Sequence, residues 1–277
     1  MKFIVLILSL LHVFSITHAK ETIYTGSTPA GNTVRRFLSI PLSDSVDFIR
    51  WKLTITGNQF RLHCNYGIGK PNTNGFMEGG TMIDLRGTII KQAMYYRCSS
   101  NARTLSMIEL NGGLFHLLDD AGRLLSGNGG WSYTLNNTAA VPPGRLMIRP
   151  SPMVVMDSMT FEGRTPCSVP GMVPAGKTCY KLKWLFVFYA DAKTRQPSGF
   201  TLNATPYRRE GTKKGKWTII KDKDGHIAWH LYDDQGRPFI FLQPASDNIL
   251  LFSDEKGNLL TGDEDFSYTL NRRKHIP

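Results

Sequence analysis

The chain has 277 residues, of which 41% are hydrophobic, and a formal net charge of +11. This length accommodates one large domain or two of ordinary size. The positive charge favours an anionic partner. However, the basic residues are scattered, without a basic helix or regular aromatic interleaving, and this pattern argues against a nucleic-acid-binding protein.

Residues 1–19 predict a secretory signal peptide. A positive start at Lys2 precedes a largely apolar stretch over residues 3–16 and a small-x-Ala end over residues 17–19. The apolar stretch is short for a bilayer core of ~30 Å, and an uncleaved anchor is the alternative. Cleavage leaves residues 20–277 with a charge of +10, since Lys2 is the only charged residue removed. We therefore predict a periplasmic or secreted protein with no transmembrane segment.

An internal repeat is the most informative feature of the sequence. The motif aromatic-x-Gly-x-Thr-Pro opens each half, at residues 24–29 and again at residues 161–166. The halves also close alike, because Trp-Ser-Tyr-Thr-Leu-Asn at residues 131–136 corresponds to Phe-Ser-Tyr-Thr-Leu-Asn at residues 266–271. A match at both ends over this distance indicates a duplicated domain.

The repeat divides the mature chain into two copies, residues 20–137 and residues 159–277. Residues 138–158 form the predicted linker, which contains Pro-Pro-Gly and Pro-Ser-Pro. Prolines at this density block regular strand pairing and stiffen the chain. Because apolar residues also punctuate this segment, we expect the linker to pack along a domain.

Both copies predict β-structure throughout. Residues 48–55 and 182–189 are rich in aromatic and β-branched side chains, and residues 60–66 alternate between apolar and polar side chains. Turn signals containing Gly, Asn and Asp separate such segments. We expect an all-β protein in which each copy forms about seven to ten short antiparallel strands, arranged as a barrel or a sandwich.

Four cysteines follow the signal peptide, and an even number in an exported chain suggests disulfides. Two lie in each half, so the expected pairs are Cys64–Cys98 and Cys167–Cys179. Their spacings are not those of a Cys-x-x-Cys redox or zinc site. Metal and redox roles are the alternatives to structural disulfides.

The motif order of the second copy resembles the N-terminal domain of NlpE-like envelope proteins, a family associated with copper tolerance and envelope stress. The matching motifs are Gly-x-Thr-Pro-Cys at 163–167, Pro-Ser-Gly-Phe at 197–200, Gly-Lys-Trp at 215–217, Asp-x-x-Gly-Asn at 254–258 and Phe-Ser-Tyr-Thr-Leu at 266–270. The resemblance covers most of residues 159–273 and, more weakly, residues 22–137. It implies that each copy is a lipocalin-like antiparallel β-barrel exposed to the periplasm.

The departures from this family concern its metal chemistry. No lipidated Cys stands at the mature start, and Cys179 lies twelve positions after Cys167 where the family has Cys-x-x-Cys. Ala30 occupies the equivalent of Cys167 in the first copy. The resemblance therefore implies the fold more than it implies metal binding.

No catalytic signature is present, and we predict that the protein is not an enzyme. A copper site is one binding hypothesis, because Met153, Met156 and Met159 offer soft thioether ligands that suit Cu(I) in an oxidising compartment. Apolar packing of these methionines is the alternative. The segment Asp222–Gly225 is similar to a calcium loop but lacks the distal ligands, which favours a hairpin turn.

A second binding hypothesis concerns the barrel interior. A barrel of about eight strands can hold one small apolar ligand, and Trp184, Trp217 and Trp229 could line such a pocket or fill the core instead. We therefore expect an exported envelope module that binds or senses a small ligand or an envelope protein. The alternative is a structural or protein-interaction module of the envelope that binds no small ligand.

Overall fold

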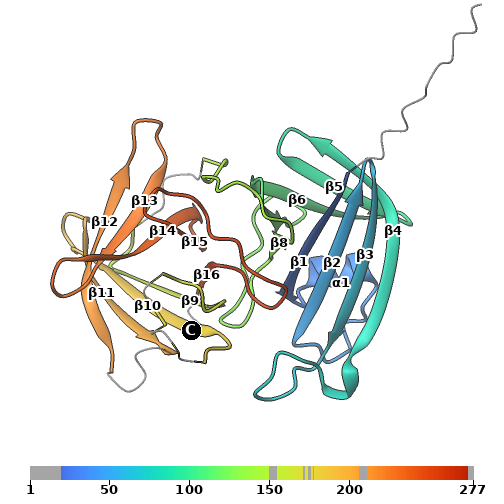
Figure 1. Cartoon of the computed structure of the whole chain (residues 1–277), viewed down its shortest axis with the longest axis horizontal. Coiled ribbons are helices and arrows are strands. Elements are labelled where there is room, and N and C mark those ends of the chain that lie inside the picture. Colours follow the sequence, from blue (N-terminus) through green and yellow to red (C-terminus); the bar gives the residue numbers. More distant parts are fainter. Residues whose placement is uncertain are drawn as a thin grey trace, which may run out of the picture.

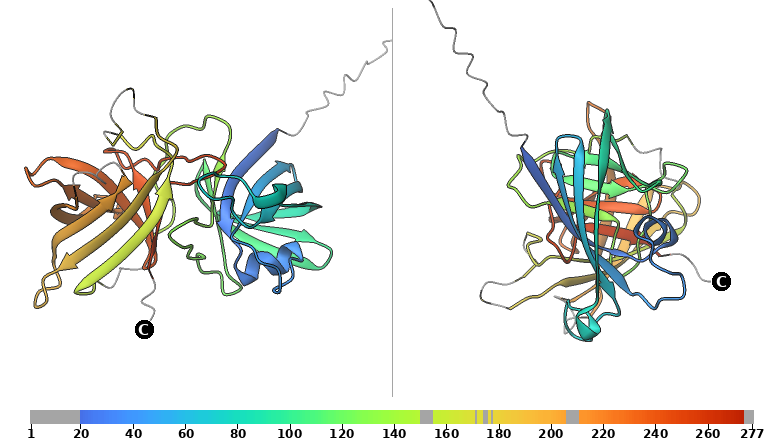
Figure 2. Two further views of the ribbon diagram at one scale, coloured as in Figure 1. Left: turned by 90° about the horizontal axis from the view of Figure 1, so that it is seen from below. Right: turned by 90° about the vertical axis from the view of Figure 1, so that its right-hand side faces the viewer.

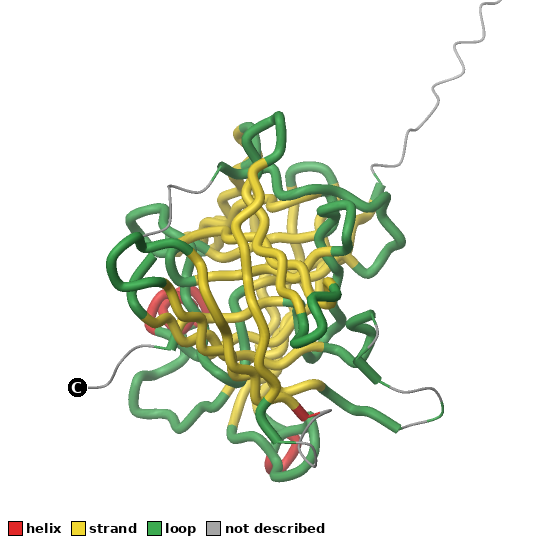
Figure 3. The backbone as a smooth tube through the Cα atoms, turned by 90° about the vertical axis from the view of Figure 1, so that its left-hand side faces the viewer, coloured by secondary structure: helices red, strands yellow, loops and turns green. Residues whose placement is uncertain are grey.

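A computed structural model describes residues 20–149, 155–170, 172–173, 176, 178–205 and 211–273. The predicted signal peptide and Met153 lie outside the described residues. Two closed eight-stranded antiparallel barrels lie side by side (Figure 1), which confirms the predicted all-β fold of two tandem barrels. Within the described residues, helix is limited to short segments (Figure 3).

Each barrel is a simple meander in which every strand pairs with the next and the last strand pairs with the first. The first barrel contains β1 (Glu21–Pro29), β2 (Phe48–Thr56), β3 (Gln59–Gly67), β4 (Thr81–Gln92), β5 (Tyr95–Ser100), β6 (Arg103–Asn111), β7 (Leu114–Leu117) and β8 (Thr134–Asn137). The second contains β9 (Ser158–Thr165), β10 (Leu182–Ala190), β11 (Pro197–Ala204), β12 (Lys213–Lys221), β13 (Ile227–Tyr232), β14 (Pro238–Ser246), β15 (Ile249–Ser253) and β16 (Thr269–Arg272).

Side chains alternate between the two faces of each strand, and the inward-facing ones fill the interior of each barrel separately. In β10, Leu182, Trp184, Phe186 and Phe188 point into the second barrel and are at most 3% exposed. The first barrel has its own cluster, to which β2 contributes Trp51. Each barrel therefore has an independent hydrophobic core, as expected for a duplicated domain.

The two copies close corresponding barrel ends by different means. In the first copy, helix α1 (Asn32–Leu38) inserts Val34 and Phe37 into the core, and the buried Arg35 donates hydrogen bonds to the carbonyls of Ala30, Pro41 and Asp44. In the second copy, a disulfide joins Cys167 to Cys179. The segment that it closes contributes Val169 and Met172 to the core.

The predicted Cys64–Cys98 disulfide is absent, and both residues are buried free thiols. Cys64 on β3 is opposite Ile83 of β4, whereas Cys98 on β5 is opposite Ile89 of the same strand. The cysteines are thus two strands apart and displaced by six residues, roughly 20 Å along β4, which is beyond the reach of a disulfide. Burial raises the pKa of the Cys98 thiol to about 12, which keeps it protonated.

A third hydrophobic cluster lies between the barrels. It combines outward-facing residues of β6 and β7 with their counterparts on β14 and β15, and Leu114 and Ile249 are equivalent members from the two copies. Because the inward residues of β7 and β15 pack in the barrel cores, these strands are buried on both faces. The left view of Figure 2 shows the barrels side by side, and this cluster is where they are in contact.

Hydrogen bonds across this interface follow a pseudo-twofold axis. Equivalent hydroxyls meet directly, with 2.6 Å between the Oγ atoms of Ser132 and Ser267 and 3.0 Å between the Oγ1 atoms of Thr134 and Thr269. The backbone N–H of Gly127 donates to the Asn271 side chain at 2.7 Å, and the equivalent N–H of Gly262 donates to Asn136 at 2.8 Å. The two copies therefore contact each other as the subunits of a twofold dimer do.

His116 breaks this symmetry, because its equivalent in the second copy is Leu251. The ring is fully buried, and its Nε2 lies 2.8 Å from the carbonyl oxygen of Leu125. Since that oxygen only accepts, Nε2 carries the hydrogen, and Nδ1 accepts from the Thr134 hydroxyl at 3.0 Å. Burial lowers the pKa of His116 to about 4, so the ring is neutral at pH 7.

The linker packs against both barrels, whereas the sequence predicted only that it packs along a domain. Leu146 is buried in the cluster between the barrels. The backbone N–H of Met147 donates to the carbonyl of Leu110 in the first barrel at 2.7 Å, and the N–H of Leu259 in the second barrel donates to the carbonyl of Gly144 at 2.9 Å. The linker is thus part of the interface.

Candidate functional site

A cleft of about 700 Å³ opens between the barrels. Its lining includes pairs of equivalent residues from the two copies, such as Trp131 with Phe266 and Phe48 with Lys181. We call this feature the interbarrel cleft. It is lined by Asp47, Phe48, Gly69, Lys70, Pro71, Asn72, Thr73, Asn74, Gly75, Trp131, Arg164, Tyr180, Lys181, Lys183, Asp265 and Phe266.

Three of the lining cations come from adjacent strands at the start of the second barrel. Arg164 on β9 is directly opposite Lys183 on β10, and Lys181 precedes β10. The Arg164 guanidinium lies over the Trp131 ring at 5.3 Å, and the Lys181 ammonium lies over the Phe266 ring at 5.4 Å. Aromatic rings thus hold two of these charges in place.

The three cations repel one another. The pKa of Lys181 is lowered first by burial and then by the charges of Arg164 and Lys183, and Asp265 only partly opposes this effect. Among the described residues, no carboxylate lies within ion-pair distance of any of the three. Like charges directly opposite across a strand pair destabilise a sheet, so this arrangement has a cost in stability.

The acidic residues of the cleft have other partners. Asp265 pairs with Arg50 of the first barrel through one oxygen and accepts from the Asn74 side-chain amide at 2.9 Å through the other. Asp47 accepts from the backbone N–H of Gly69 at 2.7 Å. The cleft therefore has an excess of positive charge that its own carboxylates do not neutralise.

Comparison of the copies shows how this excess arises. The strand registers make Arg164 equivalent to Ser27, and Lys181 and Lys183 equivalent to Phe48 and Arg50. The first copy thus has one cation at these three positions, which Asp265 neutralises, whereas the second copy has three. The equivalent of Asp265 on the other side of the axis is Gly130, which carries no charge.

None of these cations stands out in the sequence of its own copy. The signal that could have found them is the residue-by-residue difference between the two copies, not either copy alone. Their proximity also depends on how the barrels dock, and β-strand patterns do not specify that arrangement.

The proposed copper ligands are not brought together by the described part of the structure. Met159 is 1% exposed within the core of the second barrel, whereas Met156 is 51% exposed outside it. The Met156 sulfur accepts a hydrogen bond from Arg272 at 2.9 Å. Met153 lies outside the described residues, so the three-methionine hypothesis stays a prediction.

The tryptophans proposed to line a pocket pack on other rings inside the second barrel. Trp217 and Trp229 have ring centroids 4.4 Å apart, Phe188 lies 5.0 Å from Trp229, and Trp184 lies 5.2 Å from Phe252. All three tryptophans are at most 3% exposed. This packing favours the core role over the ligand pocket.

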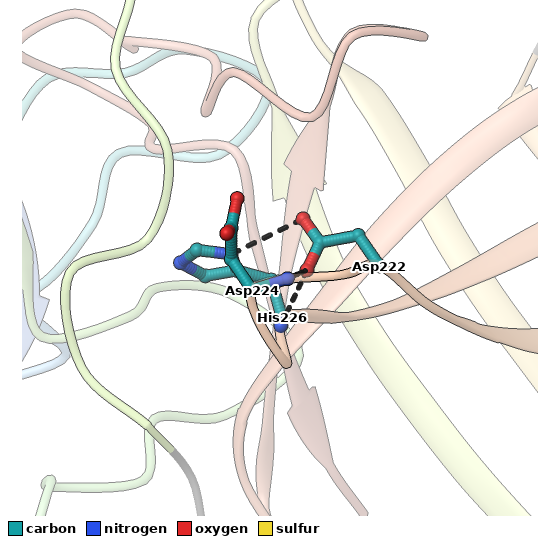
Figure 4. Close-up of side chains that lie close together, drawn as sticks. All are labelled: Asp222, Asp224 and His226. Atoms are coloured by element: carbon teal, nitrogen blue, oxygen red, sulfur yellow. Dashed lines mark hydrogen bonds and ion pairs between the residues drawn. The ribbon is translucent and has the colours of Figure 1, made fainter.

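Asp222, Asp224 and His226 bring three potential metal ligands within 4.8 Å of one another (Figure 4). Hydrogen bonds account for this arrangement. The Asp222 carboxylate accepts from the backbone N–H groups of Asp224 and His226, and Arg145 of the linker lies 2.7 Å from its other oxygen. The segment is the hairpin turn that the sequence favours, between β12 and β13.

No helix among the described residues is long and apolar enough to cross a bilayer. Comparisons of the chain with family models, curated proteins and solved structures found no match.

Proposed function

We propose that the protein is an exported, non-enzymatic binding module that takes an anionic ligand in the interbarrel cleft. The single observation that carries this proposal is the group of Arg164, Lys181 and Lys183, which face a cleft without a neutralising carboxylate. A bound anion would relieve their mutual repulsion and accept charge-assisted hydrogen bonds from them. The export part rests on the signal-peptide prediction for residues 1–19, and an envelope location is consistent with the resemblance to NlpE-like proteins.

The cleft suits ligand binding better than the barrel interiors do. It is open to solvent and combines cations with exposed apolar surface, including Tyr180, which is 83% exposed. The interior of the second barrel instead contains stacked aromatic rings, from Trp184 to Trp229. A concave site with a few convergent polar groups is the usual form of a small-molecule site.

Changing Lys181 and Lys183 to glutamine together should weaken anion binding at least tenfold, equivalent to about 1.4 kcal/mol. Removing two of the three cations leaves little charge to attract the ligand. The measurement is calorimetric titration of the mature chain with citrate and with inorganic phosphate at low ionic strength, where screening is least.

The matched control changes Lys214 and Lys216 of β12 to glutamine. This variant has the same net charge but keeps the cleft intact, and both residues are exposed. It should bind as the unchanged protein does. Absence of saturable binding to either anion, or equal loss in both variants, would show that the cleft is not the site.

A further inference from the structure

The loops that border the interbarrel cleft through Trp131 in the first copy and through Asp265 and Phe266 in the second share the same turn hydrogen bonds but differ in charge. In the second copy the loop contains Asp263, Glu264 and Asp265, and in the first copy the equivalent residues are Asn128, Gly129 and Gly130. The Asp263 side chain accepts from the N–H groups of the residues two and three positions later at 2.9 and 2.8 Å. Asn128 does the same at 2.8 and 2.9 Å.

Because the turns match, Gly130 occupies the backbone position that Asp265 holds on the other side of the axis. Asp265 reaches across the interface to pair with Arg50 of the first barrel. Gly130 has no side chain with which to reach the cations of the second barrel. Its φ lies outside the left-handed region, so the backbone conformation does not require glycine.

The space beside Gly130 is bordered by a cation and by the Asn128 side chain, and the Glu162 carboxylate lies beside the neighbouring Gly129. A Cβ atom at Gly130 would lie 3.1 Å from Oδ1 of Asn128, 3.8 Å from Nη1 of Arg164 and 3.9 Å from Cζ of Arg164. A carboxylate extending from this point would therefore meet the guanidinium of Arg164, whereas Asp265 meets Arg50, whose equivalent in the second copy is Lys183. Lys183 is directly opposite Arg164 in the sheet, and the charge of Lys181 acts on the same region.

We propose that the space beside Gly130 is a carboxylate subsite, in which an acidic group of the ligand takes the place that the Asp265 side chain holds in the other half of the interface. This inference rests on the proposed function and names the ligand class for the same cleft. Arg164 forms the charged wall, since its planar guanidinium matches a carboxylate. The carboxylate comes from a small organic acid or from an acidic peptide, and the two sources share this chemistry.

The test places a carboxylate in the proposed subsite by substitution of Gly130. Gly130→Asp should lower the affinity for carboxylate ligands at least tenfold, because the new side chain occupies the subsite. It should also raise the unfolding midpoint, since it neutralises Arg164. Gly130→Asn has nearly the same shape without the charge and should not raise the midpoint.

The titrants are citrate, inorganic phosphate, a peptide with the sequence of residues 261–267, and the same peptide with its acidic residues replaced by Asn, Gln and Asn. We expect carboxylates to bind more tightly than phosphate and the neutral peptide not to bind. Binding of citrate alone identifies a small acid as the source, and tighter binding of the acidic peptide identifies a polypeptide. Tighter binding of phosphate than of either carboxylate would overturn the ligand class.

A second variant keeps the test independent of any misfolding caused by Gly130→Asp. Arg164→Ser installs the residue of the equivalent position, Ser27, and should also weaken carboxylate binding at least tenfold. If both variants bind carboxylates as the unchanged protein does while the Lys181/Lys183 variant does not, the subsite is wrong and the cleft remains the site. If the unchanged protein binds no anion, the proposed function itself fails.

Discussion

Replacing Ile249 by aspartate is expected to separate the two barrels while each barrel stays folded. Ile249 is fully buried in the cluster between the barrels and points away from the core of its own barrel. An unpaired carboxylate there costs about 4 kcal/mol or more to bury. Each 1.4 kcal/mol changes the ratio of docked to separated barrels about tenfold, so the change is roughly a thousandfold.

Small-angle X-ray scattering would detect this separation as an increased radius of gyration. The near-ultraviolet circular dichroism of the aromatic cores should be retained, because the two barrel cores do not include Ile249. Anion binding should disappear, since both barrels contribute to the interbarrel cleft. The control is Ile220→Asp, which places the same charge at a position 42% exposed on β12.

Two results would contradict this expectation. An unchanged radius of gyration would show that the cluster does not hold the barrels together. Loss of the near-ultraviolet signal would show that the barrels depend on each other for folding, despite their separate cores.

The stability of the protein should fall by about 3 kcal/mol between pH 6.5 and pH 4 because of His116 alone. Its pKa is about 4 in the folded protein, below the unfolded value of 6.5. Well above pH 6.5 the ring is neutral in both states and contributes no pH dependence. As the pH falls, the unfolded chain takes up a proton that the folded protein does not, so stability is lost progressively down to the folded pKa.

The physical cause is burial of the ring, which disfavours its charged form, and the hydrogen bonds around the ring leave no acceptor for a second proton. Both nitrogens already have partners, because Nε2–H donates to the carbonyl of Leu125 and Nδ1 accepts from the hydroxyl of Thr134. A proton on Nδ1 would turn this acceptor into a donor facing a hydroxyl that is itself hydrogen-bonded to Thr269. It would also place a charge in a fully buried position.

His116→Leu tests this account by installing the residue found at the equivalent position, Leu251. Denaturant titrations at several pH values should show a flatter pH dependence than in the unchanged protein. The variant should also be less stable at pH 7 by about 1–3 kcal/mol, because the oxygen of Leu125 loses its donor. A variant whose stability falls as steeply with pH as that of the unchanged protein would assign the effect to other groups.

The sequence predicted two all-β copies because this information is local and duplicated, and the resemblance to NlpE-like proteins favoured the barrel over the sandwich. Alternating strands such as residues 60–66 bury one face, and the matched ends of the two copies locate the domains. The strands that form the interface also have a local signal, although the arrangement of the barrels does not. Residues 114–117 and 249–252 are almost uninterrupted apolar runs, and such runs indicate burial of both faces of a strand.

Other features depended on information that no short pattern contains. The failure of Cys64 and Cys98 to pair follows from the strand register, which displaces them along β4. Helix α1 is too short for its periodicity to stand out, and its packing in the barrel end holds it in place. The unneutralised charge of Arg164 emerges only when the folded copies are compared across their axis.

Covalent fusion of the two barrels has a genetic consequence. In a homodimer of identical subunits, each codon specifies both sides of the interface, so an acidic residue introduced at one side necessarily appears at the other. In this chain, Gly130 and Asp265 are encoded separately, and each can change while its counterpart stays the same. The chain can therefore keep the ion pair between Arg50 and Asp265, which joins the barrels, while residue 130 on the other side of the axis changes independently.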